Sequence, residues 1–145
     1  MDLKSKIILI SGPTASGKSK AALKIAKKLN GEIINADSMQ VYKELNILTA
    51  RPSKTDLNKI NHHLYGFRSV KKEFSSGEWL KLAKKNIKKI RDKNKIPVLV
   101  GGTGLYFKAL TDGLVKIPKI PISVRDKIRR MQNKLGQKKF YLKLL

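Results

Sequence analysis

The sequence predicts an α/β fold in which a parallel β-sheet is flanked by helices. Three short runs rich in apolar and β-branched residues, at 6–10, 32–36 and 96–100, have the composition of buried strands. Apolar residues at helical spacing follow each run, so strands and helices alternate along the chain. This alternation, with right-handed crossovers, is typical of a parallel sheet.

A glycine loop and a helix separate the first two strands. The loop occupies 12–19, and four apolar residues at helical spacing follow it: Ala22, Ile25, Ala26 and Leu29. Asn30-Gly31 stops this helix, and the second strand leads directly to Asp37. The span 39–74 has weak periodicity and several turn residues, so we predict mostly loop with short helical pieces.

Regular structure returns at Ser75, which fits a capping box with Glu78. The helix that starts here carries one apolar stripe, formed by Trp79, Leu82, Ala83, Ile87 and Ile90. Lysines cover its other face and predict a solvent-exposed surface. The third strand closes on glycines around Thr103 and leads into a short helix over 105–111.

The last part of the chain predicts an extended linker at 117–121 and an amphipathic helix that Gly136 caps. That helix shows Val124, Ile128, Met131 and Leu135 on one face. A further helix starts after it but has neither a cap nor a polar tail. We therefore predict a domain at 1–136, apparently truncated, and the start of an interrupted helix at 137–145.

The composition predicts a cytoplasmic protein that does not enter a membrane. The N-terminus lacks the features of a signal peptide, no apolar run approaches the roughly 20 residues of a membrane span, and cysteine is absent. The net charge of +23 has two interpretations. It indicates a polyanionic partner such as nucleic acid, or compositional bias, since Lys outnumbers Arg 27 to 6.

The loop after the first strand fits the phosphate-binding pattern G-x-x-x-x-G-K-[ST]. It reads Gly12-Pro13-Thr14-Ala15-Ser16-Gly17-Lys18-Ser19, between a strand and a helix, which makes the predicted fold P-loop NTPase-like. Backbone N–H groups of such a loop bind the phosphates of a nucleotide or a diphosphate. Lys18 would contact terminal phosphate oxygens, and the Ser19 hydroxyl would bind Mg²⁺.

The acidic residue at a strand end is Asp37 on the second strand, whereas the third strand ends without a carboxylate. Asp37 is a candidate general base or water-mediated magnesium ligand, since ligands bind at the carboxyl edge of open α/β sheets. Alternatively, it caps a helix with Gln40 as its capping-box partner.

Thr103 and the pair His62-His63 also have open interpretations. The Thr103 hydroxyl would reach a ligand at the same sheet edge, or it would cap the following helix. The histidines lack a third metal ligand at suitable spacing, so we expect them to form hydrogen bonds within a loop.

Taken together, these segments resemble the tRNA dimethylallyltransferases, also called tRNA isopentenyltransferases. The resemblance rests on GPTASGKS, NADSMQVYKELNILTARPS, HHL, IPVLVGGTGLYFKAL and DGL, in this order from residue 7 to about 135. It implies transfer of a dimethylallyl group from dimethylallyl diphosphate, with Mg²⁺, to N6 of the adenine 3′ of the anticodon. The tRNA anticodon stem-loop would be the partner.

The resemblance also implies roles for single residues. Residues 14–19 would hold the diphosphate, and Asp37 would accept the N6 proton. The flipped-out adenine would lie against Ser38, Met39 and Gln40, with Thr103 beside the reacting amine and Arg125 in contact with the tRNA. Family members continue beyond this chain. The alternatives are therefore an inactive tRNA- or diphosphate-binding remnant, and a P-loop small-molecule kinase.

Overall fold

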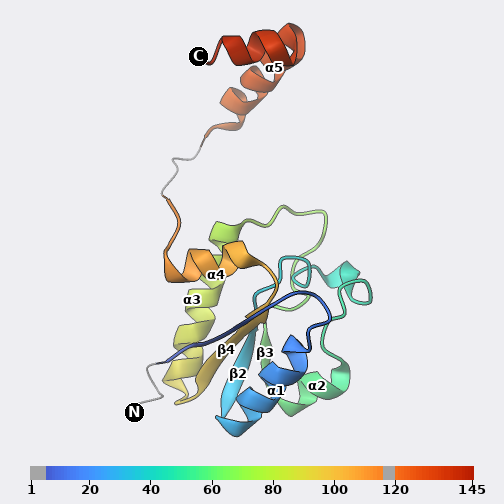
Figure 1. The fold of residues 1–145 in the computed structure, drawn as a ribbon, viewed down its shortest axis with the longest axis vertical. Helices are drawn as coiled ribbons and strands as arrows, with labels where there is room; N and C mark the ends of the chain where they lie inside the picture. The colour runs from blue at the N-terminus through green and yellow to red at the C-terminus, as the bar shows by residue number, and fades with distance from the viewer. Residues whose placement is uncertain (1–5, 116–119) are drawn as a thin grey trace. The chain divides into compact units, whose positions relative to one another are not determined.

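The computed structural model describes residues 6–115 and 120–145 and contains two compact units, Met1–Leu114 and Val115–Leu145. The first unit is an α/β sandwich that holds all the strands of the described chain (Figure 1). The expectation of a P-loop NTPase-like parallel sheet flanked by helices is confirmed.

The sheet contains four parallel strands in the order β1-β4-β2-β3. Their bounds are β1 Ile8–Ser11, β2 Gly31–Asn35, β3 His62–His63 and β4 Ile96–Gly101. One row of aligned residues crosses the whole sheet from Ile8 through Val98 and Ile33 to His62. All four strands therefore point their carboxyl ends to one edge, where the loops that follow β1, β2 and β4 meet.

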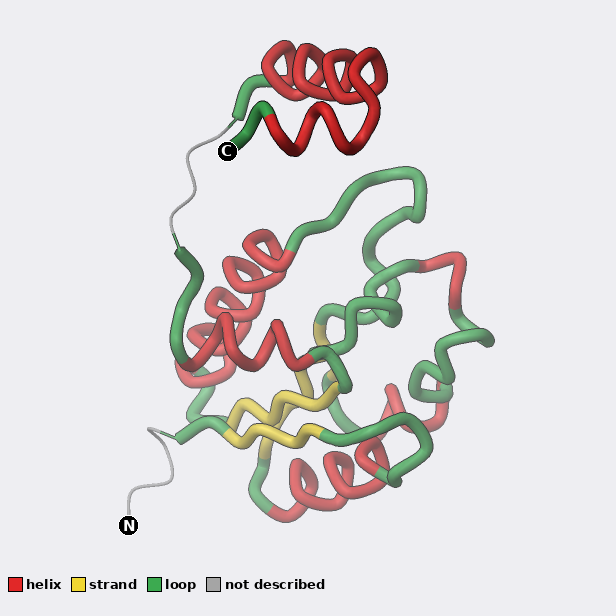
Figure 2. The backbone as a smooth tube through the Cα atoms, turned by 45° about the horizontal axis from the view of Figure 1, so that its top comes forward, coloured by secondary structure: helices red, strands yellow, loops and turns green. Residues whose placement is uncertain are grey.

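Helices cover both faces of this sheet (Figure 2). The helices are α1 Lys18–Lys28, α2 Lys54–Lys59, α3 Ser76–Asp92 and α4 Gly104–Thr111. Neighbouring residues of one strand face opposite cores, as in any pleated sheet. Ile33 and Val98 pack with Ala22 and Ala26 of α1, whereas Ile34 and Leu99 pack against α3 and α4 through Trp79, Ala83, Ile87, Ile90 and Tyr106.

Two strand expectations need correction. The run at 6–10 forms an edge strand that pairs only with β4 in the described chain, and Leu9 is 40% exposed, so this strand is not fully buried. The second correction is β3, a two-residue strand at His62–His63 where we expected loop. It is too short to show any periodicity. The rest of 39–74 matches the expected loop with short helical pieces, which are α2 and a 3₁₀ turn at Lys43–Leu45.

The capping box that we predicted at the start of α3 is confirmed. The Ser75 hydroxyl accepts a hydrogen bond from the Glu78 backbone N–H, and the Glu78 side chain accepts one from the Ser75 N–H. These bonds satisfy two N–H groups that the first turn of a helix leaves without partners.

The second unit consists of α5, Ile122–Leu142, which is two helical segments joined at Gly136. Gly136 has a φ of 71°, a backbone conformation that ends one helix before the next begins. The expected cap at this glycine is confirmed. Most of the linker predicted at 117–121 lies outside the described residues. Within the described ranges, no helix is long and apolar enough to cross a membrane.

A buried carboxylate holds together the amino-terminal edge of the sheet. Glu32 on β2 is fully buried and accepts hydrogen bonds from His63 (2.7 Å), Lys95 (3.0 Å) and Asn61 (3.1 Å). Burial alone would raise the pKa of the Glu32 carboxyl, but these three donors outweigh it and lower the pKa to about 2. The short strand β3 is therefore fixed to β2 by charge as well as by backbone pairing.

Replacing this carboxylate should destabilise the first unit in a pH-dependent way. We expect Glu32→Gln to lower the free energy of unfolding by about 2 kcal/mol at pH 7, because charge-assisted hydrogen bonds are lost. The carboxylate is more acidic in the folded state, so its contribution is complete above pH 4.5 and disappears as the pH falls toward 2. Urea unfolding at pH 7 and pH 3 should show a smaller difference from wild type at pH 3.

The matched control is Glu73→Gln, since Glu73 is exposed and its side chain accepts none of the hydrogen bonds above. It should change the unfolding free energy by less than about 0.5 kcal/mol at both pH values. An equal loss for Glu32→Gln at pH 7 and pH 3 would contradict the role of its charge.

Candidate functional site

The P-loop leaves the carboxyl end of β1 and runs into α1. Gly17 immediately precedes this helix with a φ of 81°, and Ala15 has a φ of 63°. No side chain caps the helix, so its first N–H groups stay available to a ligand. The Lys18 ammonium donates to the Pro13 carbonyl and so lies folded over its own loop. The Ser19 side chain is exposed.

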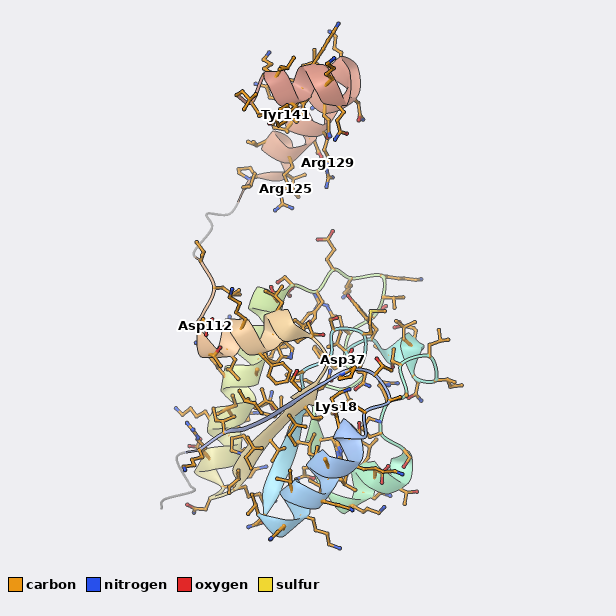
Figure 3. All side chains as sticks on the ribbon, viewed as in Figure 1. Lys18, Asp37, Asp112, Arg125, Arg129 and Tyr141 are labelled. Atoms are coloured by element: carbon orange, nitrogen blue, oxygen red, sulfur yellow. The ribbon has the colours of Figure 1, made fainter. Side chains whose placement is uncertain are left out.

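A cavity of about 650 Å³, which we call the P-loop cavity, opens beside this loop. Lys18 and Asp37 both line it, from the start of α1 and from the end of β2 (Figure 3). Its lining comprises residues 14–20 together with Asp37, Met39, Gln40, Leu45, residues 48–50, Tyr65, Val100 and Gly101. The P-loop part of the lining therefore offers N–H groups and ammonium groups, while most of the other lining residues are apolar.

One oxygen of the Asp37 carboxylate accepts a hydrogen bond, and the other is available to a ligand. Oδ1 accepts a hydrogen bond from the Met39 N–H at 2.9 Å, and within the described chain no donor reaches Oδ2. No helix begins here, and the Gln40 side chain donates instead to the Thr49 carbonyl. The alternative of a helix cap at Asp37 is therefore wrong, because the chain makes a local turn through the carboxylate.

The backbone of Asp37 is held by its neighbour two residues earlier. The buried Asn35 amide donates to the carbonyls of Asp37 and Leu64, and its oxygen accepts from the Asp37 N–H. The Trp79 indole donates to the Asn35 carbonyl and stacks on Tyr106, with ring centroids 4.2 Å apart. The hydrogen bonds of the Asn35 side chain and of the Trp79 indole thus hold the end of β2 that leads to Asp37.

Glycines of β4 permit the strand ends to come close together. A Cβ placed on Gly101 would lie 2.1 Å from the carbonyl carbon and oxygen of Ala36 and 2.7 Å from the Asp37 nitrogen. A Cβ on Gly102 would lie 3.6 Å from the Gly12 oxygen and 3.8 Å from Asp37 Oδ2. The start of the P-loop, the end of β4 and the carboxylate therefore meet within a few ångströms.

Thr103 contacts the segment after Asp37. Its hydroxyl oxygen accepts a hydrogen bond from the Ser38 N–H at 2.9 Å and donates to the Ser38 hydroxyl at 3.3 Å. Thr103 precedes α4, but its side chain does not cap that helix. The capping alternative is therefore wrong for the side chain. Neither Ser38 nor Thr103 lines the P-loop cavity, whereas Met39 and Gln40 do.

The other predicted residues lie outside this arrangement. His63 donates a hydrogen bond to the distant Glu32 carboxylate, so the expectation of bonding within a loop is wrong for His63. His62 contacts the nearby Ile60 carbonyl. No group of three metal-binding side chains occurs among the described residues. Arg125 belongs to α5 in the second unit, and its contact with tRNA stays a prediction.

Two tyrosines near Asp37 were not predicted as site residues from the sequence. Burial, and then the charge of Asp37, raise the pKa of the Tyr65 phenol above its usual range. Burial, followed by Tyr42 and Asp37, raises the pKa of Tyr106 to about 12. Both phenols therefore stay protonated at neutral pH. Tyr65 belongs to no chemical motif, and Tyr106 lies in the segment IPVLVGGTGLYFKAL without a role of its own there. Only the fold therefore brings the two phenols to the carboxylate.

Comparison with protein families gives one matching family model, described as IPP transferase, over residues 40–145. A curated relative named tRNA dimethylallyltransferase from Pelagibacter ubique is 66% identical over all 145 residues, which span 46% of that relative. Another of this name, from Parvibaculum lavamentivorans, is 52% identical over 86% of the chain and 40% of its own length. The chain thus spans less than half of these relatives.

Solved structures that are similar to this chain also extend well beyond it, since the chain covers less than half of each of the two described next. The full-length tRNA isopentenylpyrophosphate transferase of Bacillus halodurans is 36% identical with a TM-score of 0.75, over 90% of this chain and 44% of that one. A eukaryotic dimethylallyltransferase acting on tRNA is 32% identical with a TM-score of 0.76, over 89% of this chain and 34% of its own.

The close approach of β4 and β2 gives a testable prediction. We expect Gly101→Ala to lower the unfolding free energy by about 1–3 kcal/mol, because the new Cβ would overlap the Ala36 backbone. Gly104→Ala is the matched control, since a Cβ there meets nothing within 4 Å. This control should be neutral or stabilise α4 by up to about 1 kcal/mol. Thermal unfolding of both variants tests this, and equal stability of the two would contradict it.

Proposed function

Because the chain belongs to the IPP transferase family, we propose that it carries the catalytic part of a tRNA dimethylallyltransferase. The reaction transfers a dimethylallyl group from dimethylallyl diphosphate to N6 of the adenine 3′-adjacent to the anticodon. The observation that carries this proposal is the P-loop cavity, which Asp37 and the phosphate-binding loop line together.

The P-loop side of the cavity is suited to the diphosphate. The uncapped start of α1 offers backbone N–H groups, and Lys18 and Lys20 add positive charge. When the allylic C–O bond breaks, the diphosphate gains negative charge, which these groups stabilise. The Lys18 ammonium has three N–H donors, of which the Pro13 carbonyl uses one, so the others are available to the diphosphate. Apolar residues of the same lining, such as Met39 and Leu45, provide a surface for hydrocarbon or a base.

Asp37 is suited to accept the proton of the adenine amine. The exocyclic N6 is a weak nucleophile because its lone pair is conjugated to the ring, so a placed base assists its attack on the allylic carbon. Oδ1 is held by the Met39 N–H, which leaves Oδ2 to take the proton. Thr103 supports this geometry through Ser38, the residue that follows the carboxylate.

Mg²⁺ fits this site only together with the diphosphate. The exposed Ser19 hydroxyl lines the cavity and would supply one oxygen ligand, and hard oxygen ligands are those that Mg²⁺ prefers. The described chain holds no cluster of acidic side chains that would bind the ion alone, so diphosphate oxygens would complete its shell. When bound, the ion would help neutralise the leaving group.

The second unit has the charge expected of an RNA-binding element. Residues 120–145 contain eight basic side chains and a single acidic one, Asp126, which gives a net charge of +7. Salt-dependent contacts of Lys and Arg with phosphates supply much of the affinity of such elements. We propose that α5, with Arg125 in its first turn, contacts the tRNA backbone.

Mass spectrometry of an anticodon stem-loop RNA tests the transfer directly. The chain is incubated with this RNA, dimethylallyl diphosphate and Mg²⁺, and the gain of one dimethylallyl group is measured. We expect Asp37→Asn to lower the rate about 100-fold or more, because the amide cannot accept the proton. Asp92→Asn replaces an exposed aspartate at the end of α3, outside the cavity, and should leave the rate unchanged.

The same assay separates the proposal from its alternative. A folded chain that binds the RNA but transfers no group would support an inactive tRNA- or diphosphate-binding segment. The specific reason to consider this alternative is that the chain spans 46% of its Pelagibacter ubique relative. Transfer that survives in Asp37→Asn would instead show that another group takes the proton.

A further inference from the structure

The segment 43–51 forms a loop at the opening of the P-loop cavity. Leu48 lines this cavity and is nonetheless 86% exposed, so it lies where the cavity meets the solvent. Its neighbour Ile47 is 93% exposed and lines another cavity of about 620 Å³, which shares two lining residues with the first. Among the described residues of the first unit, these are the two most exposed large apolar side chains. We call Ile47 and Leu48 the apolar tip.

Hydrogen bonds hold this loop in one conformation. The Thr49 hydroxyl donates to the Leu45 carbonyl at 2.6 Å. The Arg51 guanidinium donates to the Asn46 side chain at 3.0 Å and to the Lys43 carbonyl at 3.1 Å, so the last residue of the loop is tied to its first. A fixed backbone therefore presents the apolar tip to solvent. A surface that is ordered in advance loses little conformational entropy when a partner covers it.

The apolar tip continues into the cavity lining. Met39, which follows the Asp37–Ser38 segment, lines the same cavity as Leu48 and is 51% exposed. The opening of the cavity thus carries several apolar side chains on one rim, which is more than the single exposed apolar residues that occur on any protein surface. Covering such a rim in place of water is favourable.

The charges around the rim favour RNA as the partner that covers it. Lys18 and Lys20 line the cavity, and the exposed Lys43 begins the loop. The acidic residue of the loop, Glu44, accepts a hydrogen bond from the Val70 N–H and is therefore engaged with another segment. Unstacked RNA bases have apolar faces and are joined by phosphates, so they need apolar side chains and cations side by side.

A base that enters the P-loop cavity has neighbours that stay outside. In the proposed function the adenine leaves its stack to reach Asp37, which removes its contacts with the bases on either side. Those bases remain joined to it by the RNA backbone, so they lie at the opening of the cavity, where the apolar tip is. Aliphatic side chains placed against a freed base face replace part of the lost stacking, as they do in proteins that unstack base steps.

We propose that Ile47 and Leu48 bind the face of a base next to the extruded adenine and so keep the anticodon loop unstacked. The contact is apolar, so it adds affinity for unstacked bases without neutralising phosphates. This inference rests on the proposed function, because it requires an adenine in the P-loop cavity. It gives the loop 43–51 a role in RNA binding that differs from that of the basic residues of α5.

Binding of two fluorescently labelled RNAs to the whole chain tests this inference. One is the anticodon stem-loop, and the other is a fully paired duplex with the same number of phosphates. We expect Ile47→Ser/Leu48→Ser to raise the Kd for the stem-loop about tenfold and to leave the Kd for the duplex unchanged, because only the loop offers unstacked bases to an apolar surface. The slope of log Kd against log salt should stay that of wild type, since it reports phosphate contacts.

Val115→Ser is the matched control, because Val115 is 87% exposed and lines neither of the two cavities. It should leave both Kd values unchanged. The conservative double variant Ile47→Leu/Leu48→Ile keeps the apolar surface and should retain the wild-type affinity for the stem-loop. Thermal unfolding should give the same midpoint for all variants, since substitutions of exposed side chains change stability little.

Three results would overturn the inference while leaving the proposed function intact. One is wild-type affinity of Ile47→Ser/Leu48→Ser for the stem-loop. Another is an equal loss of affinity for the duplex, or a changed salt slope, which would assign the loop to phosphate contacts. The third is a wild-type dimer in size-exclusion chromatography that this variant dissociates, which would make the apolar tip an interface between copies. If wild type neither binds the stem-loop nor transfers a dimethylallyl group to it, the proposed function fails, and the inference fails with it.

Discussion

The close contact between β2 and β4 at Gly101 is the constraint on which the site depends. No side chain fits between Gly101 and the Ala36 backbone, so the two strand ends lie nearly against each other. Asp37 and the P-loop, which come from opposite sides of β4, can share one cavity only because of this contact. Asn35 and Trp79 then fix the direction in which the strand leaves the sheet. The arrangement of the site at this edge therefore depends first on the backbone packing at Gly101 and then on the side chains of Asn35 and Trp79.

The two edges of the sheet use their carboxylates in opposite ways. At the amino-terminal edge, Glu32 is buried and accepts hydrogen bonds from several basic and amide groups, which hold its pKa well below the usual range. At the carboxyl-terminal edge, Asp37 is half-buried and keeps one oxygen without a donor in the described chain. A carboxylate satisfied on all sides contributes to stability, and one left partly unsatisfied can react. The same sheet thus separates a charge that contributes to stability from a charge with an oxygen that is available to a ligand.

The structural features that depend on local residue spacing could be predicted from the sequence. The P-loop, the capping box at Ser75 and the three longer strands follow from spacing and residue type, and the structure contains each of them. The strand at His62–His63 could not be predicted, because two residues carry no periodicity and their stability comes from Glu32, some thirty positions away. Tyr65 was missed for the same reason, since it comes near Asp37 only after β3 pairs with β2. Both alternatives of helix capping, at Asp37 and Thr103, failed because long-range and turn contacts occupy those side chains.

The exposed edge of the sheet has a consequence for the behaviour of this chain in solution. In the described residues, β1 pairs on one side only, and Leu9 is exposed beside its free backbone groups. Such an edge can template the strand of a second molecule. The net charge of +23 opposes this association by repulsion, and dissolved salt screens that repulsion over about 10 Å at 0.1 M. A rise in salt concentration should therefore favour self-association of the chain through this edge, and a low salt concentration should keep its molecules apart.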